Sequence, residues 1–161
     1  MKNNYEVKGS YTTIYVSCKE EVFECIIDTD DLEKVSEYSW YVNPKGYILC
    51  RREETTYIHR LITSCPKGKQ VDHINRNKLD NRKENLRIVT NRQNCQNRAL
   101  MPNNKTGYRG VYFENYTQKY RVQLVIDGKT MDFGRYEDID VAGYVAGQII
   151  KNFMPYAEGA V

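Results

Sequence analysis

Apolar residues recur at regular intervals in the first third of the chain. Residues 5–28 alternate in places between apolar and more polar positions, with Ile14 and Val16 on one side. A period of two predicts short β-strands. An aspartate, Asp30 or Asp31, then precedes apolar residues spaced three apart, so we expect a capped short helix there.

Turn-forming residues divide the next region. The sequence Asn-Pro-Lys-Gly at 43–46 separates short apolar runs at 40–42 and 47–49, which predicts a hairpin. Residues 58–62 predict a short helix. A loop follows at 66–68, where Pro and Gly flank a lysine.

Two further apolar runs, at 70–74 and 86–89, lie on either side of a polar loop. They predict a hairpin with a long, irregular turn. A helix is expected to begin at Thr90, because Thr90 and Gln93 have the spacing of a capping box. Asparagine is a poor helix former, so a helical face that carries three of them indicates that the amides have a function. These three are Asn91, Asn94 and Asn97.

The last third of the chain has a different pattern. Residues 99–107 lose the apolar period and contain Pro102 and Gly107, which indicates a linker. The pair Asp127-Gly128 is a preferred two-residue hairpin turn. Three antiparallel strands and one helix are expected, at 108–113, 119–126, 129–133 and 137–153.

Side-chain alternation predicts how this sheet packs. Val122 and Leu124 would face the helix. The helix carries a small apolar stripe formed by Ala142, Ala146 and Ile149. The chain is therefore expected to be an α+β protein, with an N-terminal mixed region, a strand–strand–helix element, and a three-stranded antiparallel sheet packed on one helix.

Charge is unevenly distributed along the chain, although the formal net charge is only +3. Residues 1–56 carry seven Lys or Arg and eleven Asp or Glu, whereas residues 67–98 carry nine and three. Clustered basic charge is expected where a protein binds a polyanion. A solvated surface would also explain a basic run, but this run surrounds Asp72 and His73.

Cysteine usage and the apolar runs argue against several classes of protein. The five cysteines are odd in number and include no Cys-x-x-Cys pair, which argues against a disulfide framework and a zinc site. The sequence has neither an N-terminal apolar segment nor eighteen consecutive apolar residues. We therefore expect no secretion and no membrane span, and a cytoplasmic location.

Residues 71–97 contain the groups needed to hydrolyse a phosphodiester. The neutral imidazole of His73 can take a proton from water, because the unperturbed pKa of histidine lies near cellular pH. The carboxylate of Asp72 and the amide oxygen of Asn94 are hard ligands of the kind that Mg²⁺ accepts. A metal held there would stabilise charge on the phosphate and on the leaving oxygen.

This segment resembles the HNH endonuclease motif, the strand–strand–helix metal finger of phage and intron-encoded homing endonucleases. The resemblance implies that His73 is the general base and that Asn85 braces the loop that orients it. It also implies that Asp72 and Asn94 bind Mg²⁺ or another divalent cation such as Mn²⁺. Residues 57–62 resemble the region that precedes the motif in phage members, which suggests a bacterial or phage-infected host cell.

Several roles stay open. His59 would either buttress the site or pack beneath the finger, and Asn97 competes with Asn94 as a metal ligand. Many relatives carry Gly where this chain has Arg76. Arg76 would be strained if that position needs a positive φ, or it would contact phosphate. The other candidates for phosphate contacts are Arg60, Arg82, Arg87 and Arg92.

A second resemblance covers about residues 107–153. The segments Tyr108–Val111, Lys119–Val122 and Phe133–Tyr136 resemble the Apetala-type DNA-binding domain of plant ethylene-response factors. In that family a three-stranded sheet lies in the major groove, which implies a β-sheet mode of base recognition. The side chains expected to face DNA are Arg109, Tyr112, Lys119, Arg121, Gln123 and Thr130.

This second module departs from its family at two positions. Asp132 stands where relatives often carry an aromatic residue, and Val125 stands where Arg is common, so the base preference does not carry over. Residues 99–161 include seven basic and seven acidic residues, which argues against a purely electrostatic grip on DNA. A protein-interaction domain is the alternative.

The sequence thus predicts a metal-dependent, site-directed DNA endonuclease of the phage or homing type. Residues 1–98 would form the nuclease domain, with the ββα-metal (HNH) core at about 70–98. Residues 99–107 would be the linker, and residues 108–154 the DNA-binding domain. Double-stranded DNA is the expected partner, bound by a nicking monomer or by a dimer. The alternatives are a sequence-specific DNA-binding regulator with an inactive finger and a structure-selective nuclease of packaging or recombination.

Overall fold

The computed structural model describes residues 2–51 and 53–157, which divide into two compact units between Asn91 and Arg92. Residues 92–98 therefore group with the second unit, whereas the sequence assigned them to the nuclease domain. The reason is a set of contacts within the second unit. The Gln93 side chain donates to the Tyr156 hydroxyl at 2.8 Å, and the Gln96 side chain accepts from the Tyr156 backbone N–H at 3.1 Å.

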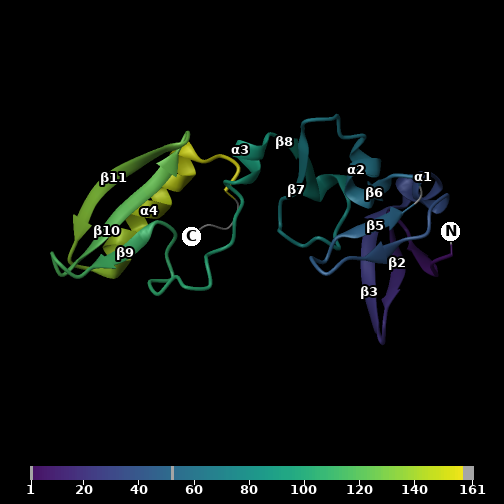
Figure 1. Cartoon of the computed structure of the whole chain (residues 1–161), viewed down its shortest axis with the longest axis horizontal. Coiled ribbons are helices and arrows are strands. Elements are labelled where there is room, and N and C mark those ends of the chain that lie inside the picture. The colour runs from purple at the N-terminus through teal and green to yellow at the C-terminus, as the bar shows by residue number, and fades with distance from the viewer. Residues whose placement is uncertain (1, 52, 158–161) are drawn as a thin grey trace. The chain divides into compact units, whose positions relative to one another are not determined.

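The first unit begins with an antiparallel three-stranded sheet in the order β1-β2-β3 (Figure 1). Its strands are β1 Tyr5–Lys8, β2 Tyr11–Cys18 and β3 Glu21–Asp28, so the strands predicted at 5–28 are confirmed. A 3-10 turn at Thr29–Asp31 leads into α1 Leu32–Ser36. Asp31 occupies the cap position, but its side chain makes no capping hydrogen bond. It instead forms an ion pair with Lys83 at 3.0 Å, so capping by an aspartate was wrong.

A second small sheet contains the predicted hairpin. It is formed by β4 Tyr41–Val42, β5 Ile48–Arg51 and β6 Thr55–Tyr57. The Asn43 carboxamide oxygen accepts the backbone N–H groups of Lys45 and Tyr47 at 2.9 and 3.0 Å. An asparagine that replaces a backbone acceptor in this way stabilises a tight turn. The predicted helix follows as α2 Ile58–Thr63.

The strand–strand–helix element is also present. β7 Gln70–His73 pairs antiparallel with β8 Leu86–Val89, so that Asp72 lies opposite Arg87. A 3-10 turn at Lys83–Asn85 closes the long loop between them. The helix α3 begins after Thr90 as expected, but it covers only Asn91–Asn94. Asn97 lies beyond its end, so the prediction of one helical face with three asparagines was wrong. Four residues are too few for propensity to extend a helix rich in asparagine.

One hydrophobic core joins these pieces of the first unit. It includes residues of the first sheet, of α1 and α2, and of the β7–β8 hairpin, among them Ile14, Ile27, Val35, Trp40, Ile58, Val71 and Leu86. The indole N–H of Trp40 is satisfied inside this core by the Val35 carbonyl at 3.0 Å. The hairpin that carries Asp72 and His73 is therefore held by packing on the N-terminal region.

The second unit is a three-stranded antiparallel sheet with one helix along one face (Figure 1). Its elements are β9 Val111–Glu114, β10 Lys119–Ile126, β11 Lys129–Tyr136 and α4 Ile139–Phe153. Asp127 and Gly128 both have positive φ, +54° and +77°, as a type I′ hairpin turn requires. α4 starts two residues later than predicted because Asp138 is its cap and accepts two backbone N–H groups.

The predicted packing of this sheet on α4 is confirmed. Val122 and Leu124 are buried at 0% and 4% exposure. Ala142 and Ala146 of the helix pack with Val122, and Ile150 of the helix packs with Leu124. Small side chains let the helix approach closely. The α+β fold class is thus confirmed. Among the described residues, no helix is long and apolar enough to cross a membrane.

Candidate active site

His73 ends β7 and is 5% exposed. Its Nε2 atom lies 3.1 Å from the carboxamide oxygen of Asn81, a residue of the loop between β7 and β8. Its ring lies 5.2 Å from the ring of His59 and 6.2 Å from the ring of Tyr47, measured between centroids. A histidine held on several sides in this way has one well-defined orientation.

The pKa of His73 is lowered from its ordinary value of 6.5, mainly because burial penalises the charged imidazolium. The hydrogen bond to Asn81 and the negative charge of Asp72 act in the opposite direction and are smaller. His73 is therefore neutral at pH 7. A neutral imidazole is the form that a general base requires.

His59, on α2, packs against the same cluster. It is 7% exposed, with ring centroids 5.5 Å from those of both Tyr47 and Tyr57. Its Nδ1 atom is buried and finds no hydrogen-bond partner among the described residues. Burial, followed by the nearby His73, lowers the pKa of His59 to about 3. The His59 and His73 rings contact edge to face, with 5.2 Å between their centroids.

His59 should make the first unit sensitive to acid. Because its pKa is about 3 in the folded chain and about 6.5 in the unfolded chain, the unfolded chain binds an extra proton between these values. This contribution to stability is complete above pH 6.5 and is lost as the pH falls toward 3. We expect His59→Phe, which keeps a ring but cannot titrate, to lower the pH dependence of the unfolding free energy by about 1 kcal/mol per pH unit in that window. Urea unfolding at pH 7, 6, 5 and 4 measures this. Equal slopes for both proteins would contradict it.

Asn85 connects the two ends of the loop that follows His73. Its side-chain oxygen accepts the backbone N–H of Asn75 at 2.9 Å, and its side-chain amide donates to the Asp80 carbonyl at 2.7 Å. Its backbone carbonyl also accepts the N–H of Ile74 at 2.8 Å. Asn85 is 6% exposed. These contacts hold the loop rather than reach toward a substrate.

Arg76 lies in this loop with φ +63°, so the position does require the left-handed conformation that the sequence comparison with glycine suggested. Its backbone N–H donates to the His73 carbonyl at 2.9 Å, which closes a turn directly after β7. A non-glycine residue with this φ costs about 1 kcal/mol. The strain is thus stored next to His73.

Asp72 and Arg87 form an ion pair across the β7–β8 hairpin. The Arg87 Nε and Nη2 atoms both lie 2.8 Å from Asp72 Oδ2. The two side chains are 8% and 18% exposed. Arg87, expected to contact phosphate, is therefore occupied by the carboxylate that was expected to bind a metal.

Other arginines proposed for phosphate contacts are also engaged within the protein. Arg82 forms a two-point contact with Asp80 at 2.8 and 2.9 Å and pairs with Glu84 at 2.6 Å. This contact lowers the pKa of Asp80. Arg60 donates to backbone carbonyls of the loop after α2, including that of Lys69 at 2.9 Å. Within the second unit, Arg92 pairs with Asp127, and Arg109 donates to the Gln96 carbonyl.

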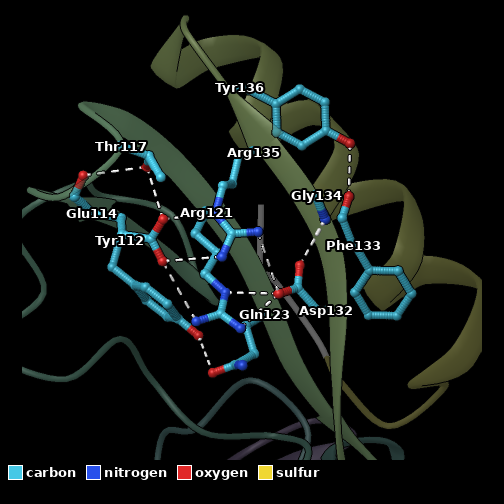
Figure 2. Close-up of polar contacts among 10 residues, drawn as sticks. All are labelled: Tyr112, Glu114, Thr117, Arg121, Gln123, Asp132, Phe133, Gly134, Arg135 and Tyr136. Carbon is cyan, nitrogen blue, oxygen red and sulfur yellow. Dashed lines mark hydrogen bonds and ion pairs between the residues drawn. The ribbon is translucent and has the colours of Figure 1, made fainter.

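The face of the second sheet opposite α4, called the open face below, carries a network of ion pairs (Figure 2). Arg121 contacts Asp132 through Nε and Nη2 at 2.8 and 2.6 Å, and its Nη1 lies 3.6 Å from Glu114. Glu114 also accepts from Arg135 Nε at 2.6 Å. Tyr112 donates its hydroxyl to Gln123 at 2.7 Å on the same face.

The structure thus brings most of the predicted DNA-facing residues together. Strand pairing sets Tyr112 beside Arg121 and Gln123 beside Asp132, on the face opposite α4. Lys119 and Thr130 belong to this face by the alternation of their strands. Arg109 precedes β9 and contacts Gln96, so it is not part of this face.

Asn81 and the segment that supports it were not predicted from the sequence. Asn81 is fully buried, and its backbone N–H donates to the Ile26 carbonyl of β3 at 2.7 Å. Ile26 in turn donates to the Leu79 carbonyl at 2.8 Å, and the Lys83 N–H donates to the Asp28 carboxylate at 2.7 Å. β3 therefore holds the loop behind His73. The neighbouring Asp80 is buried as well, at 4% exposure, and no local sequence pattern marks either residue as buried.

The donor chemistry fits a hard divalent cation held by few protein ligands. Among residues 2–51 and 53–157, no group of three or more His, Cys, Asp or Glu side chains could hold a metal ion. Mg²⁺ often takes only one or two carboxylates and completes its shell with water and phosphate oxygens. Asp72 carries a carboxylate of this kind and is 7% exposed. The amide oxygens expected as further ligands belong to Asn94 and Asn97, which lie in the second unit.

Known proteins agree with this geometry. The sequence model of the HNH endonuclease family matches residues 57–96, from the end of β6 to just beyond α3. Residues 57–96 form an HNH endonuclease domain. This HNH domain contains Asp72, His73, Asn81 and Asn85.

Two viral proteins are similar to this chain. An uncharacterized HNH endonuclease of Acanthamoeba polyphaga mimivirus is 34% identical over 96 residues, which cover 56% of this chain and 51% of the relative. Protein 3.8 of Escherichia phage T7 is 26% identical over 80 residues, which cover 50% of this chain and 66% of the relative. The chain thus spans about half the length of the first relative and just under two thirds of the second. No solved structure matches the chain significantly.

Proposed function

We propose that this protein is a divalent-metal-dependent DNA endonuclease in which His73 is the general base. The observation that carries the proposal is a neutral, buried, firmly oriented His73 at the end of β7, inside an HNH domain. Asp72, the adjacent residue on the same strand, provides a carboxylate beside it. The site type we favour is that of phage or homing endonucleases.

Each residue has a separate task in this proposal. His73 takes the proton of the water that attacks the phosphorus. Asn85 keeps the loop after β7 in place, so that the position of His73 is fixed before DNA binds. Preorganisation of this kind removes part of the reorganisation that the reaction would otherwise require.

Asp72 with Asn94, or with Asn97 as the alternative, would hold the metal. A bound divalent cation supplies charge stabilisation for the phosphate and for the departing oxygen. The ion would be Mg²⁺ or a similar divalent cation such as Mn²⁺. When the cation binds, the Asp72 carboxylate has to contact both Arg87 and the cation, or it has to release Arg87.

That same ion pair favours a second candidate function. A carboxylate already neutralised by Arg87 is what a DNA-binding regulator with an inactive finger would retain. Such a protein would bind one DNA sequence tightly and leave the strands intact.

Supercoiled plasmid separates the two functions. We expect relaxed circles or linear product in about 5 mM Mg²⁺. We expect neither product after the metal is removed with EDTA. Plasmids with a random insert library extend the assay to site preference. Binding without relaxed or linear product, in Mg²⁺ and in Mn²⁺, would overturn the endonuclease proposal and support the regulator.

We further propose that the open face of the second sheet binds the DNA duplex, as the Apetala-type resemblance implies. Its two arginines are held by two carboxylates, so the face is preorganised but nearly neutral. Specific contacts to bases, rather than phosphate attraction, then supply most of its affinity.

Removing one of these carboxylates should therefore tighten non-specific binding. Asp132→Asn releases Arg121 and adds one positive charge, so the slope of log affinity against log salt should steepen by about 0.9. Fluorescence anisotropy with duplex DNA, at salt concentrations of about 50–300 mM, measures this slope. Asp140→Asn is the matched control, because it makes the same charge change on α4, the opposite side of the sheet. Equal slopes for both variants would contradict DNA binding by this face.

A further inference from the structure

Asn81 is the buried polar side chain that contacts His73 most directly. It is 0% exposed and lies in the loop between β7 and β8. Its carboxamide oxygen lies 3.1 Å from His73 Nε2. Its carboxamide nitrogen donates to the Lys78 carbonyl at 3.2 Å and lies 3.3 Å from the Cys25 sulfur. Asn81 is none of the residues expected to act as general base, loop brace or metal ligand.

The orientation of the Asn81 amide is set by its neighbours. The Lys78 carbonyl can only accept a hydrogen bond, so the NH₂ group of Asn81 has to face it. The Cys25 sulfur is a neutral thiol, because burial raises its pKa to about 12, and it also accepts from the NH₂ group. The carboxamide oxygen is thereby left to face His73.

This orientation decides which nitrogen of His73 carries the proton. A carboxamide oxygen has no hydrogen to give, so the bond at 3.1 Å requires an N–H at Nε2. A neutral imidazole has a single N–H. The lone pair of His73 is therefore at Nδ1.

We propose that Asn81 is a positioning residue that holds His73 in the Nε2–H tautomer, so that Nδ1 is the atom that accepts the proton of the attacking water. The inference rests on the proposed function of His73 and names the atom and the partner through which that function operates. Asn81 acts on the reaction only through His73.

The support behind Asn81 is rigid. Its backbone N–H is bound to the Ile26 carbonyl of β3, and Ile26 is bound to Leu79. Both segments belong to the first unit, and the Cys25 contact comes from the same strand. A buried polar network whose members are all satisfied keeps one arrangement. The oxygen that faces His73 is therefore held in one position.

The tautomer can be measured without any cleavage assay. The chain contains only two histidines, so long-range ¹H–¹⁵N spectra of uniformly ¹⁵N-labelled protein contain two imidazole patterns, and the His59→Phe variant assigns them. At pH 7.5, we expect His73 to show a protonated Nε2 and an unprotonated Nδ1. A protonated Nδ1 in His73, or a pattern that does not change in Asn81→Leu, would overturn the proposal.

Two variants separate the positioning role from a structural one. Asn81→Asp and Asn81→Leu are similar in size, and both lose the NH₂ group that binds Lys78. Only aspartate keeps an oxygen that accepts from Nε2. We expect kcat to fall about 10²- to 10⁴-fold in Asn81→Leu, the scale at which loss of the correct tautomer acts elsewhere, with KM little changed. Asn81→Asp should retain kcat within about tenfold.

The two variants are compared below the melting temperature of each, so that only folded protein is assayed. If Asn81 were merely structural, Asp would lose as much activity as Leu or more, because it adds a buried charge. That result would overturn the positioning role. Failure of the wild-type chain to cut DNA would instead overturn the proposed function, while the NMR spectra would still report the tautomer. The two failures are therefore distinguishable.

Discussion

Replacing His73 with glutamine is expected to reduce DNA cleavage by about 10²- to 10⁴-fold, the usual contribution of a general base. Glutamine has a similar length and can donate to the Asn81 oxygen in place of Nε2, so the loop keeps its contact. It cannot accept a proton from water near neutral pH. The loss should therefore appear in kcat and not in the melting temperature. Quantified nicking of supercoiled plasmid, with circular dichroism melting of each protein, measures both.

His59→Phe is the matched control for this experiment. It removes the other imidazole of the same cluster, 5.2 Å from His73 between ring centroids, and leaves the expected base intact. Cleavage within about tenfold of wild type would assign His59 to packing. A loss as large as that of His73→Gln would show that His59 takes part in the reaction. Wild-type cleavage by His73→Gln would contradict the assignment of the base.

The pH dependence of the wild-type enzyme should follow from the same burial. As the proposed base, His73 would work only while it is neutral, and burial lowers its pKa below the ordinary value of 6.5. Activity should hold as the pH falls through 6.5 and should be lost only below it. A midpoint of the acid limb above 6.5 would mean that a different group, or a charged partner of His73, controls the rate.

The sequence alone predicts those parts of the structure that depend on local residue patterns. The hairpin turn at Asp127-Gly128 and the inward positions of Val122 and Leu124 were predictable because turn chemistry and strand alternation depend on neighbouring residues. The same holds for the strand that ends at His73. The positive φ of Arg76 was also indicated, because relatives carry glycine there.

The contacts that tune the site could not be predicted, because they join residues distant in sequence. Cys25 is 56 residues from Asn81, and no local pattern pairs them. The Asp72–Arg87 pair depends on the exact register of β7 on β8, which a loop of irregular length leaves open. The length of α3 was mispredicted for another reason. Asparagine has a low helix propensity, and after Asn94 the backbone forms three-residue turns, with Gln96 N–H bound to the Gln93 carbonyl and Asn97 N–H bound to the Asn94 carbonyl.

The Asp72–Arg87 pair should stabilise the fold in a way that can be separated from function. Both side chains are largely buried, at 8% and 18% exposure. Arg87→Met leaves the Asp72 carboxylate without its guanidinium partner, and we expect a loss of about 3 kcal/mol of unfolding free energy. Asp72→Leu should cost a similar amount. The double variant Asp72→Leu/Arg87→Met should recover most of that loss, because apolar residues of similar size often replace a buried pair without penalty. Urea unfolding of all four proteins gives the coupling energy.

Cleavage by the same four proteins then decides what Asp72 does. If Asp72 binds the metal, the double variant is stable but does not cut, and added Mg²⁺ or Mn²⁺ does not restore cleavage. If Asp72 serves only as the partner of Arg87, activity returns together with stability. We expect the first result, because a carboxylate beside the base is the only acidic side chain on the β7–β8 hairpin strands among the residues that the structure describes. Arg87→Met should keep measurable Mg²⁺-dependent cleavage at temperatures where it is folded. A stable and active double variant would remove Asp72 from the metal site and leave the amide oxygens to be tested in its place.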